Sequence, residues 1–431
     1  MERYSEYKNS GVKWLGEIPS HWEVCKSKYL WKENVELSEL GKEDLLSVSQ
    51  YDGVSPAKGE SRSESLKGYK IVSENDLVIN IMLAWLGGLG VSRYNGLVSP
   101  AYCTYKMVGN NNPRYLHYLY KTPIYLAEFA RHSTGVVPSR WRMYTDDFGQ
   151  ILTLLPPKDG QEAIANYLDT TTSKIDSAIA QQQKMIDLLN ERKQIIINNA
   201  VTKGLDPNVK MKPSGIDWIG NIPAHWEVNK FKNLFKTRTG ITFTKADLVE
   251  EGERVISYGQ IHSRENWRAS VNPALIRYIP SKLTKAKDGA LAVKGDFLFA
   301  DTSEDFEGCG NNLYIDTDKP IYAGYHTILA KQNNNECGQY LAYLFASTKW
   351  RGQVRSMVNG VKVFSITQSI INNALIILPS KKEQQEIANY ITKRIVIIDK
   401  AIRRHNERIS LLQERKQIII NDVVTGKVKV I

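Results

Sequence analysis

The sequence contains one unusual segment twice, 204 residues apart. Residues 16–32 read GEIPSHWEVCKSKYLWK, and residues 220–236 read GNIPAHWEVNKFKNLFK. Two later pairs are offset by 223 residues: EAIANYLDTTTSKIDSAI at 162–179 with QEIANYITKRIVIIDKAI at 385–402, and ERKQIIIN at both 191–198 and 414–421. Repeats on this scale predict a chain built from two copies of one structural unit.

The interiors of the two copies differ, although the matched segments on either side of them, called the frame below, are kept. The second copy is 19 residues longer between the matched segments, and residues 33–147 show little resemblance to residues 237–368. A chain of 431 residues is long enough for two large cores. We therefore predict two domains and two arms, with bounds 1–157 (first domain), 158–204 (first arm and linker), 205–380 (second domain) and 381–431 (second arm).

Short apolar runs alternate with turn signals in both interiors, which is typical of strands. In the first copy these runs are DLVINIML and GLVSPAYCTYKM, and in the second they are RVISYGQI, GDFLFA and AGYHTILA. Residues 113–133 and 338–357 have helical patterns and occupy corresponding places in the two copies. Each domain is therefore predicted to be mixed and mainly β, with one helical pair.

A long helix is predicted after each domain, because no Pro or Gly interrupts residues 161–199 or 384–422. At a rise of about 1.5 Å per residue, such a helix is roughly 60 Å long. Each helix has a row of mostly apolar residues, called its seam below, that are spaced alternately by four and three, a period of 3.5 residues. The seam residues are Ile175, Ile179, Gln182, Ile186, Leu189, Lys193 and Ile196 in the first helix, and Ile398, Ile402, His405, Ile409, Leu412, Lys416 and Ile419 in the second.

The two seams are most simply satisfied by each other, as an antiparallel coiled coil; the alternative is that each helix docks on its own domain. Gln182 and His405 are equivalent residues near the helix midpoints, and only midpoint residues meet their equivalents in an antiparallel pair. We therefore expect Gln182 to face His405, with Ile175 opposite the layer of Leu412. One polar layer in an apolar seam fixes its register. The predicted fold class is α+β, with an internal pseudo-two-fold repeat.

The net charge of +11 gives modest support for an anionic partner. Residues 381–431 carry 12 Lys and Arg against 6 Asp and Glu, so most of the excess lies in the last segment. A solvated basic helix explains much of it. The sequence has no apolar run long enough for a membrane span, and its charged start lacks the apolar core of a signal peptide. We therefore expect a cytoplasmic protein without a membrane segment.

Motifs that catalysis would require are missing from the sequence. There is no GxxxxGK[ST] phosphate loop, and WLGGLG at 85–90 lacks the context of a dinucleotide or S-adenosylmethionine site. No [DNS]PP[YFW] run occurs, and the two E-x-K triplets, at 191–193 and 414–416, lie on predicted helices without a partner Asp. We expect no catalytic residue in this chain.

Three groups of polar residues have both a structural and a functional interpretation. The cysteines form no CxxC pair, so reduced thiols are favoured over a zinc site. The histidines between Pro and Trp in both frames are interpreted as structural rather than as a catalytic pair. The acidic ADTSEDFEG turn matches no calcium loop and is interpreted as solvated rather than cation-binding. These residues are Cys25, Cys103, Cys309 and Cys337; His21 and His225; and Asp301, Glu304, Asp305 and Glu307.

Several motifs are shared with one known family. They are SGVKWLGEIPSHWEV and SGIDWIGNIPAHWEV in the frames, MLAWLGGLGVSRYNGLVSPAY at 82–102, LPSKKEQQEIANY before the second arm, and VTKGLDPNVKMKPSG at 201–215. On these motifs the chain resembles, over essentially its full length, the specificity subunits of Type I restriction-modification systems. One departure is DGQE at 159–162 where the second copy has KEQQE, which puts the start of the first arm in doubt.

The resemblance implies two target-recognition domains held apart by antiparallel helices, each reading one half of an asymmetric bipartite DNA site. It also implies partners: double-stranded DNA, two methyltransferase subunits that carry the S-adenosylmethionine, and restriction subunits in the full complex. No cofactor or metal is expected in this chain. An adaptor protein whose arms recruit partners without reading DNA is the alternative. A stand-alone DNA enzyme is a third interpretation, disfavoured by the missing motifs.

Sequence reading by a mainly β domain requires polar and basic side chains on loops that reach base edges or phosphates. At each candidate position a solvated loop residue is the alternative. The first-domain candidates are Ser49, Gln50, Tyr51, Lys58, Arg62, Ser139, Arg140 and Arg142. The second-domain candidates are Tyr258, Gln260, His262, Arg264 and Lys362.

Overall fold

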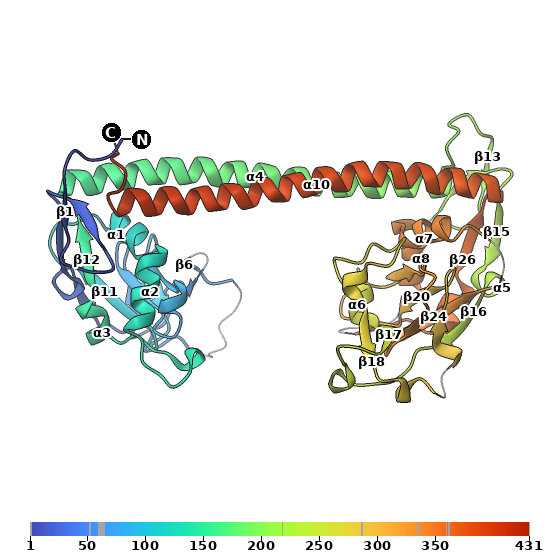
Figure 1. Ribbon diagram of the computed structural model, residues 1–431, viewed down its shortest axis with the longest axis horizontal. Coiled ribbons are helices and arrows are strands. Elements are labelled where there is room, and N and C mark those ends of the chain that lie inside the picture. The colour runs from blue at the N-terminus through green and yellow to red at the C-terminus, as the bar shows by residue number, and fades with distance from the viewer. Residues whose placement is uncertain are drawn as a thin grey trace. The chain divides into compact units, whose positions relative to one another are not determined.

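The computed structural model describes residues 2–50, 53–58, 65–217, 219–285, 288–333, 336–358, 360 and 363–430. The chain divides into two compact units, Met1–Gln183 with Asn406–Ile431, and Lys184–His405. Each unit therefore contains one mixed domain and part of both long helices (Figure 1).

The first unit is built on a four-stranded antiparallel sheet in the order β4 (Trp31–Asn34), β11 (Cys103–Met107), β8 (Leu77–Ile79) and β9 (Leu89–Val91). Four two-stranded ladders surround it: β1 (Tyr7–Asn9) with β2 (Glu17–Pro19), β3 (Glu23–Lys26) with β12 (Leu152–Leu155), β5 (Leu46–Ser49) with β6 (Gly53–Pro56), and β7 (Lys70–Val72) with β10 (Gly96–Val98). Its helices are α1 (Pro113–Tyr120), α2 (Pro123–Arg131) and α3 (Thr145–Gln150), with 3-10 turns η1 (Ser27–Tyr29), η2 (Ala84–Leu86) and η3 (Pro138–Arg140).

The second unit contains two four-stranded sheets. Their orders are β16 (Phe235–Thr239), β24 (Thr327–Gln332), β20 (Phe297–Ala300), β22 (Asn312–Tyr314), and β18 (Arg277–Ile279), β17 (Glu253–Ile256), β23 (Ile321–Ala323), β19 (Leu291–Ala292). The two-stranded ladders are β13 (Met211–Pro213) with β14 (Asn221–Pro223), β15 (Glu227–Lys230) with β26 (Leu375–Leu378), and β21 (Thr302–Ser303) with β25 (Phe364–Ser365). The short helices are α5 (Phe231–Leu234), α6 (Tyr258–His262), α7 (Gly338–Ala346), α8 (Thr348–Ser356) and α9 (Gln368–Asn373).

The helical pair predicted in each domain is confirmed as α1 with α2 and α7 with α8. Helix α1 begins where the Asn112 side chain accepts hydrogen bonds from two backbone N–H groups and Pro113 takes the first helical position. The strand predicted through RVISYGQI is wrong beyond Ile256. There the backbone N–H of Ser257 donates to the Gln260 side chain at 3.0 Å, as part of a capping box that starts α6.

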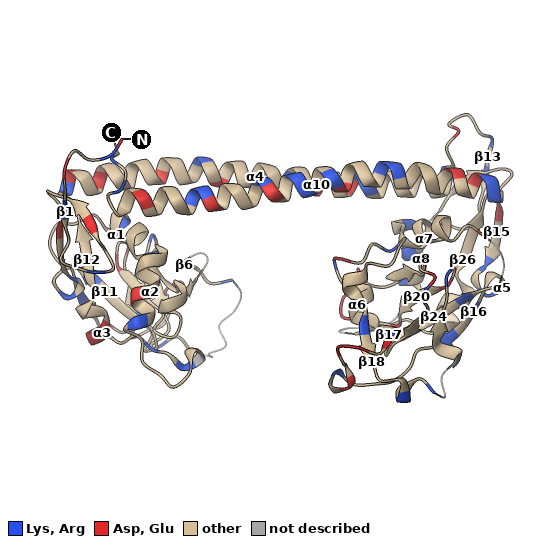
Figure 2. Cartoon of the chain, viewed as in Figure 1, with Lys and Arg blue, Asp and Glu red and all other residues tan. Residues whose placement is uncertain are grey.

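The two arms are helices α4 (Lys158–Lys203, 46 residues) and α10 (Lys381–Val424, 44 residues), both longer than predicted. Both carry basic and acidic residues along their length (Figure 2). They begin at equivalent residues, so the DGQE departure does not shift the start of the first arm. Gly160 lies in the first turn of α4. Its weak helix propensity costs little there, because packing rather than propensity stabilises most protein helices.

Within each unit, α4 and α10 pack antiparallel. In the first unit, Ile164 and Leu168 share a core with Ile420 and Val424, and Lys416 Nζ lies 2.7 Å from Asp176. In the second unit, the core near the end of α4 includes the start of α10, and the ion pair equivalent to the first joins Lys193 Nζ and Asp399 at 2.8 Å. Residue numbers therefore rise along one helix as they fall along the other, and the predicted fold class is confirmed.

Burial along both helices follows the predicted 3.5-residue period. Ile175, Ile186 and Ile398 are buried, and the other seam residues are half-buried. Side chains that face away from the seam, such as Leu188 and Leu411, are 50% and 65% exposed. The meeting of Gln182 with His405 stays a prediction.

Each Pro-x-His-Trp frame holds the end of a long helix. In the first unit the chain after α10 turns at Gly426 (φ 73°), which packs against Pro19 and Trp22, and Tyr7 Oη donates to the Gly426 carbonyl at 3.0 Å. The backbone N–H of Lys429 donates to the Glu2 carbonyl at 2.9 Å, so the two ends of the chain meet.

The second unit makes the equivalent arrangement through the covalent linker that follows α4. Gly204 (φ 74°) packs against Trp226, whose indole Nε1 donates to Glu383 Oε1 at 3.0 Å. His225 Nε2 lies 2.8 Å from the other oxygen of the same carboxylate. His21 instead packs against the Tyr4 ring, with centroids 5.4 Å apart. These contacts support the structural interpretation of both histidines.

We predict that Gly426→Ala destabilises the first unit by about 2 kcal/mol, because it adds the strain of a left-handed residue to a steric clash. A Cβ at this position would lie 2.5 Å from Pro19 Cδ. The control is Gly16→Ala, which has a similar φ of 68° and no heavy atom within 4 Å of the new Cβ. Denaturant unfolding of both variants separates the steric clash from the backbone strain. Equal losses of stability would contradict a stabilising contact of Gly426 with Pro19 and Trp22.

Candidate nucleic-acid interface

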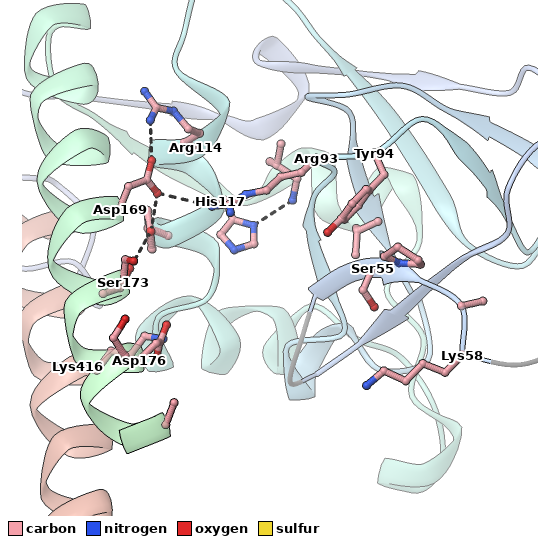
Figure 3. Close-up of a pocket in the computed structure, with 18 residues that line it drawn as sticks. Ser55, Lys58, Arg93, Tyr94, Arg114, His117, Asp169, Ser173, Asp176 and Lys416 are labelled. Carbon is pink, nitrogen blue, oxygen red and sulfur yellow. Dashed lines mark hydrogen bonds and ion pairs between the residues drawn. The ribbon is translucent and has the colours of Figure 1, made fainter. Parts of the chain in front are cut away.

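A groove of about 1270 Å³ lies in the first unit between the mixed domain and the arm helix α4 (Figure 3). Its domain wall comes from β6, the segment after β9 and helix α1, and its opposite wall comes from α4 with Lys416 of α10. The volume exceeds the ~300–1,000 Å³ typical of small-molecule pockets. An extended polymer or a partner segment is a better match for its size.

The two carboxylates in the groove are neutralised by neighbours. Asp169 accepts hydrogen bonds from Arg114 at 2.6 Å and from the Tyr118 hydroxyl at 2.7 Å (Figure 3). Asp176 is paired with Lys416, as described above. The acidic charge of the groove is therefore already compensated within the chain.

Cationic groups in the same groove are less constrained. The Arg93 side chain is 74% exposed and lies 3.7 Å from Asp169. Lys58 and Tyr94, on the domain wall of the groove, are exposed as well. His117 Nδ1 accepts from the backbone N–H of Val91 at 3.1 Å. Burial, with the charge of Lys121 next, lowers the pKa of His117 to about 4, so its ring is neutral at pH 7. The groove therefore presents uncompensated positive charge and polar donors, which are the groups that contact phosphates.

The first-domain candidates do not gather in one place. Lys58 lines the groove, and Ser49 ends β5, while the Gln50 carbonyl accepts from Lys121 Nζ at 3.0 Å. Arg140 is exposed at the end of η3, which also contains Ser139. Arg142 is half-buried and donates to the Trp141 carbonyl at 2.7 Å. Tyr51 and Arg62 lie outside the described residues.

Arg93 and Tyr94 are among the groove residues that sequence reasoning missed. They lie between the buried strands β9 and β10, in the turn SRYNG. An Arg-Tyr pair in a short turn between two apolar runs is a signal that could have drawn attention to them. Their neighbours on α4 could not be identified without the fold.

In the second domain, Tyr258, Gln260 and His262 lie together on α6, and Arg264 follows as an exposed residue. The Gln260 side chain caps its own helix, and the His262 ring nitrogens contact the Thr302 carbonyl at 2.8 Å and the Asn311 side chain at 2.9 Å. Lys362 lies outside the described residues. Base reading by any of these candidates stays a prediction.

The remaining functional alternatives gain no support. Asp301 lies 3.2 Å from His326, and Glu307 lies 2.8 Å from Arg355, so the acidic turn is divided between separate partners. Across the described ranges, no three His, Cys, Asp or Glu side chains gather as metal ligands. All four cysteines are free. No helix among the described residues is both long and apolar enough to cross a membrane.

A family model and the curated relatives that match this chain all name Type I restriction specificity proteins. The family model for the Type I restriction modification DNA specificity domain matches residues 223–410. The specificity subunit of the Type I restriction enzyme MjaVIII from Methanocaldococcus jannaschii is 25% identical over 292 residues, covering 66% of this chain and 63% of that protein. The putative MjaX specificity subunit of the same organism is 28% identical over 288 residues, covering 64% and 59%. The aligned part is thus less than two thirds of either relative.

A solved structure has a similar fold. It comes from work on complex assembly and conformational transition of the type I R-M system, and it matches with a TM-score of 0.69 over 95% of this chain and 99% of that chain. At 13% sequence identity this likeness concerns the fold alone.

Proposed function

Because the chain belongs to the family of Type I restriction-modification specificity subunits, we propose that it is the DNA sequence-recognition subunit of such a complex. In this proposal each domain reads one half of an asymmetric bipartite site. The observation that carries it is a kept frame around diverged interiors. A homodimer would read a palindrome, whereas two different domains on one repeated frame address two different half-sites.

The arms support a role in binding partners. Leu188 and Ile195 on α4 are seven residues apart and each 50% exposed, and their equivalents on α10, Leu411 and Ile418, are 65% and 52% exposed. An apolar pair repeated at heptad spacing outside the seam is suited to a further helix. We propose that each arm surface binds one methyltransferase subunit, which carries the S-adenosylmethionine, and that restriction subunits join the full complex. The chain itself is proposed to be non-catalytic and cytoplasmic.

The groove in the first unit supports contact with the DNA backbone. We predict that Arg93→Gln weakens binding to all DNA sequences alike and lowers the slope of log affinity against log salt by about one. The control is Lys106→Gln, which removes a cation that is paired with Glu36 at 3.4 Å outside the groove. Fluorescence anisotropy over a range of salt concentrations measures both quantities. A loss restricted to one base position would instead mark Arg93 as a base reader.

The proposed function is tested by sequencing the methylated bases of a host with and without this gene, in the presence of the methyltransferase partner. We expect one asymmetric bipartite motif to be methylated only when the gene is present. Unchanged methylation, or a palindromic motif, would contradict the proposal. The adaptor alternative predicts partner binding without any sequence-specific DNA binding, which the same complex tests in a binding assay.

A further inference from the structure

Three arginines gather in the second domain beside the loop that follows β20. Arg351 and Arg355 lie on α8, and Arg268 lies in the segment between α6 and β18. The backbone N–H of Tyr314, in β22, donates to the Arg268 carbonyl at 2.8 Å. The equivalent positions on α2 of the first domain are Leu126 and Ala130. The cationic cluster is therefore a property of the second domain alone and not of the shared frame.

The cluster has more positive charge than its neighbours compensate. Glu307 is the carboxylate that pairs with it among the described residues, with its Oε2 2.8 Å from Arg355. Arg351 donates to the backbone carbonyls of Glu307 and Cys309. Burial, followed by the charges of Arg268 and Arg355, lowers the pKa of Arg351 to about 9. Like charges held together in this way are stabilised by an added anion.

Two features of the cluster indicate unused binding capacity. Arg268 NH1 and Arg355 Nε are buried and have no hydrogen-bond partner within the described part of the chain. Such groups are rare in native proteins because an unsatisfied buried donor is costly. Arg268 also has a φ of 61°, a left-handed conformation that is uncommon for a residue other than Gly and is often found at functional sites.

The carboxylate of Glu307 lies on the solvent side of this cluster. Its side chain is 83% exposed, whereas that of Arg355 is 12% exposed. The Phe306 ring, 45% exposed, lies beside the Arg355 guanidinium at 5.9 Å. An anion approaching Arg355 from solvent would therefore meet the Glu307 carboxylate first and would take over its ion pair.

We propose that Arg268, Arg351 and Arg355 form a binding site for a DNA backbone phosphate, and that Glu307 occupies this site in the free chain as an internal substitute for the phosphate. The inference rests on the proposed DNA-binding function and adds the site and its competitor. Arg355 exchanges the Glu307 carboxylate for the phosphate and keeps its hydrogen bond to the Glu307 backbone carbonyl at 2.5 Å. Arg351, fixed by two backbone carbonyls, and Arg268 supply positive charge from behind it.

Opposite effects of two single substitutions test this proposal. Arg355→Gln should weaken binding of the full-length chain to any short duplex about tenfold or more and lower the salt slope by about one. Glu307→Gln should strengthen binding about two- to fivefold, because it removes the competing charge. If the ion pair were purely structural, both variants would bind DNA more weakly than the wild type or with unchanged affinity. The exposed Glu307 substitution leaves the backbone contacts of its loop in place, so its result stands even if Arg355→Gln misfolds.

The matched control is the exposed ion pair of the same unit, Lys294 with Asp318 at 2.9 Å. Lys294→Gln and Asp318→Asn change the net charge identically and should alter affinity by less than about twofold. Equal effects at both pairs would overturn the proposal, as would unchanged or weaker binding by Glu307→Gln. If the wild-type chain binds DNA sequence-specifically while these variants behave alike, only the phosphate site is wrong. If the wild type binds no DNA, the proposed function itself fails.

Discussion

Replacement of residues 33–147 by the corresponding segment of another recognition domain is expected to change one half of the recognised DNA sequence and leave the other half intact. The physical reason is that part of the frame is held by contacts between residues that all lie outside the exchanged segment. Strand β3 pairs with β12 over four residues, and the Pro19 and Trp22 side chains pack against the end of α10. These contacts involve none of the residues 33–147, so the exchange leaves them in place.

The expected effect is large, because specific sites typically bind ~10³- to 10⁷-fold more tightly than unrelated DNA. The original half-site should therefore cease to be methylated, while the second half-site is retained at an unaltered spacing. Contacts across the junction must be kept in the graft, among them Arg114 with Asp169, and the Asn112 N–H with Gln161 Oε1 at 2.8 Å. Without these contacts the new domain would lose part of its attachment to α4.

The reciprocal exchange of residues 237–368 is the control, and it should change only the other half-site. Sequencing of methylated bases reads both outcomes in one experiment. If either exchange altered both half-sites together, the two domains would not read DNA independently. Exchange that abolished methylation altogether, with the protein still folded, would indicate that the interiors also bind the methyltransferase.

The arms could be predicted from the sequence because their signal is both periodic and duplicated. Lys193 and Lys416 are equivalent positions in the two seams, and each meets the equivalent aspartate, Asp399 or Asp176. A one-dimensional pattern fixes such contacts because helix geometry maps residue number directly onto position. The helix ends were less predictable: Gly160 suggested a later start than the one observed.

The recognition surfaces could not be predicted to the same degree, because they depend on which loops the fold brings together. Lys58 and Arg93 are far apart in sequence and line one groove. His262 looked like a free polar residue on a loop, yet both of its ring nitrogens have partners within the domain. The arginine cluster was missed because Arg268 and Arg355 come from separate segments, neither of which contains a recognisable motif. Tertiary placement, rather than local pattern, decides which of these side chains can contact DNA.

The orientation of the arms leads to a second large expected effect, in disulfide crosslinking. In a chain with its native cysteines replaced by serine, Ile175→Cys with Leu412→Cys should crosslink on mild oxidation. Ile175 precedes Asp176 by one residue, and Leu412 precedes Lys416 by four; Asp176 and Lys416 form an ion pair at 2.7 Å. The Ile175 side chain is buried and the Leu412 side chain is half-buried. Leu189→Cys with Ile398→Cys should crosslink in the same way, since the Lys193 to Asp399 pair lies close by.

The control combines Ile175→Cys with Ile398→Cys, equivalent seam positions that a parallel pair would bring together. A disulfide requires Cα atoms within about 7 Å, so the two geometries give opposite bands on a non-reducing gel. The first two cysteine pairs should give the band of a chain closed into a loop by a disulfide, and the third pair should not. Because the antiparallel crosslinks join residues that already lie together, the oxidised protein should also keep its DNA specificity. Crosslinking of the control pair alone would mean parallel arms, and the pseudo-two-fold frame on which two different half-sites depend would then be lost.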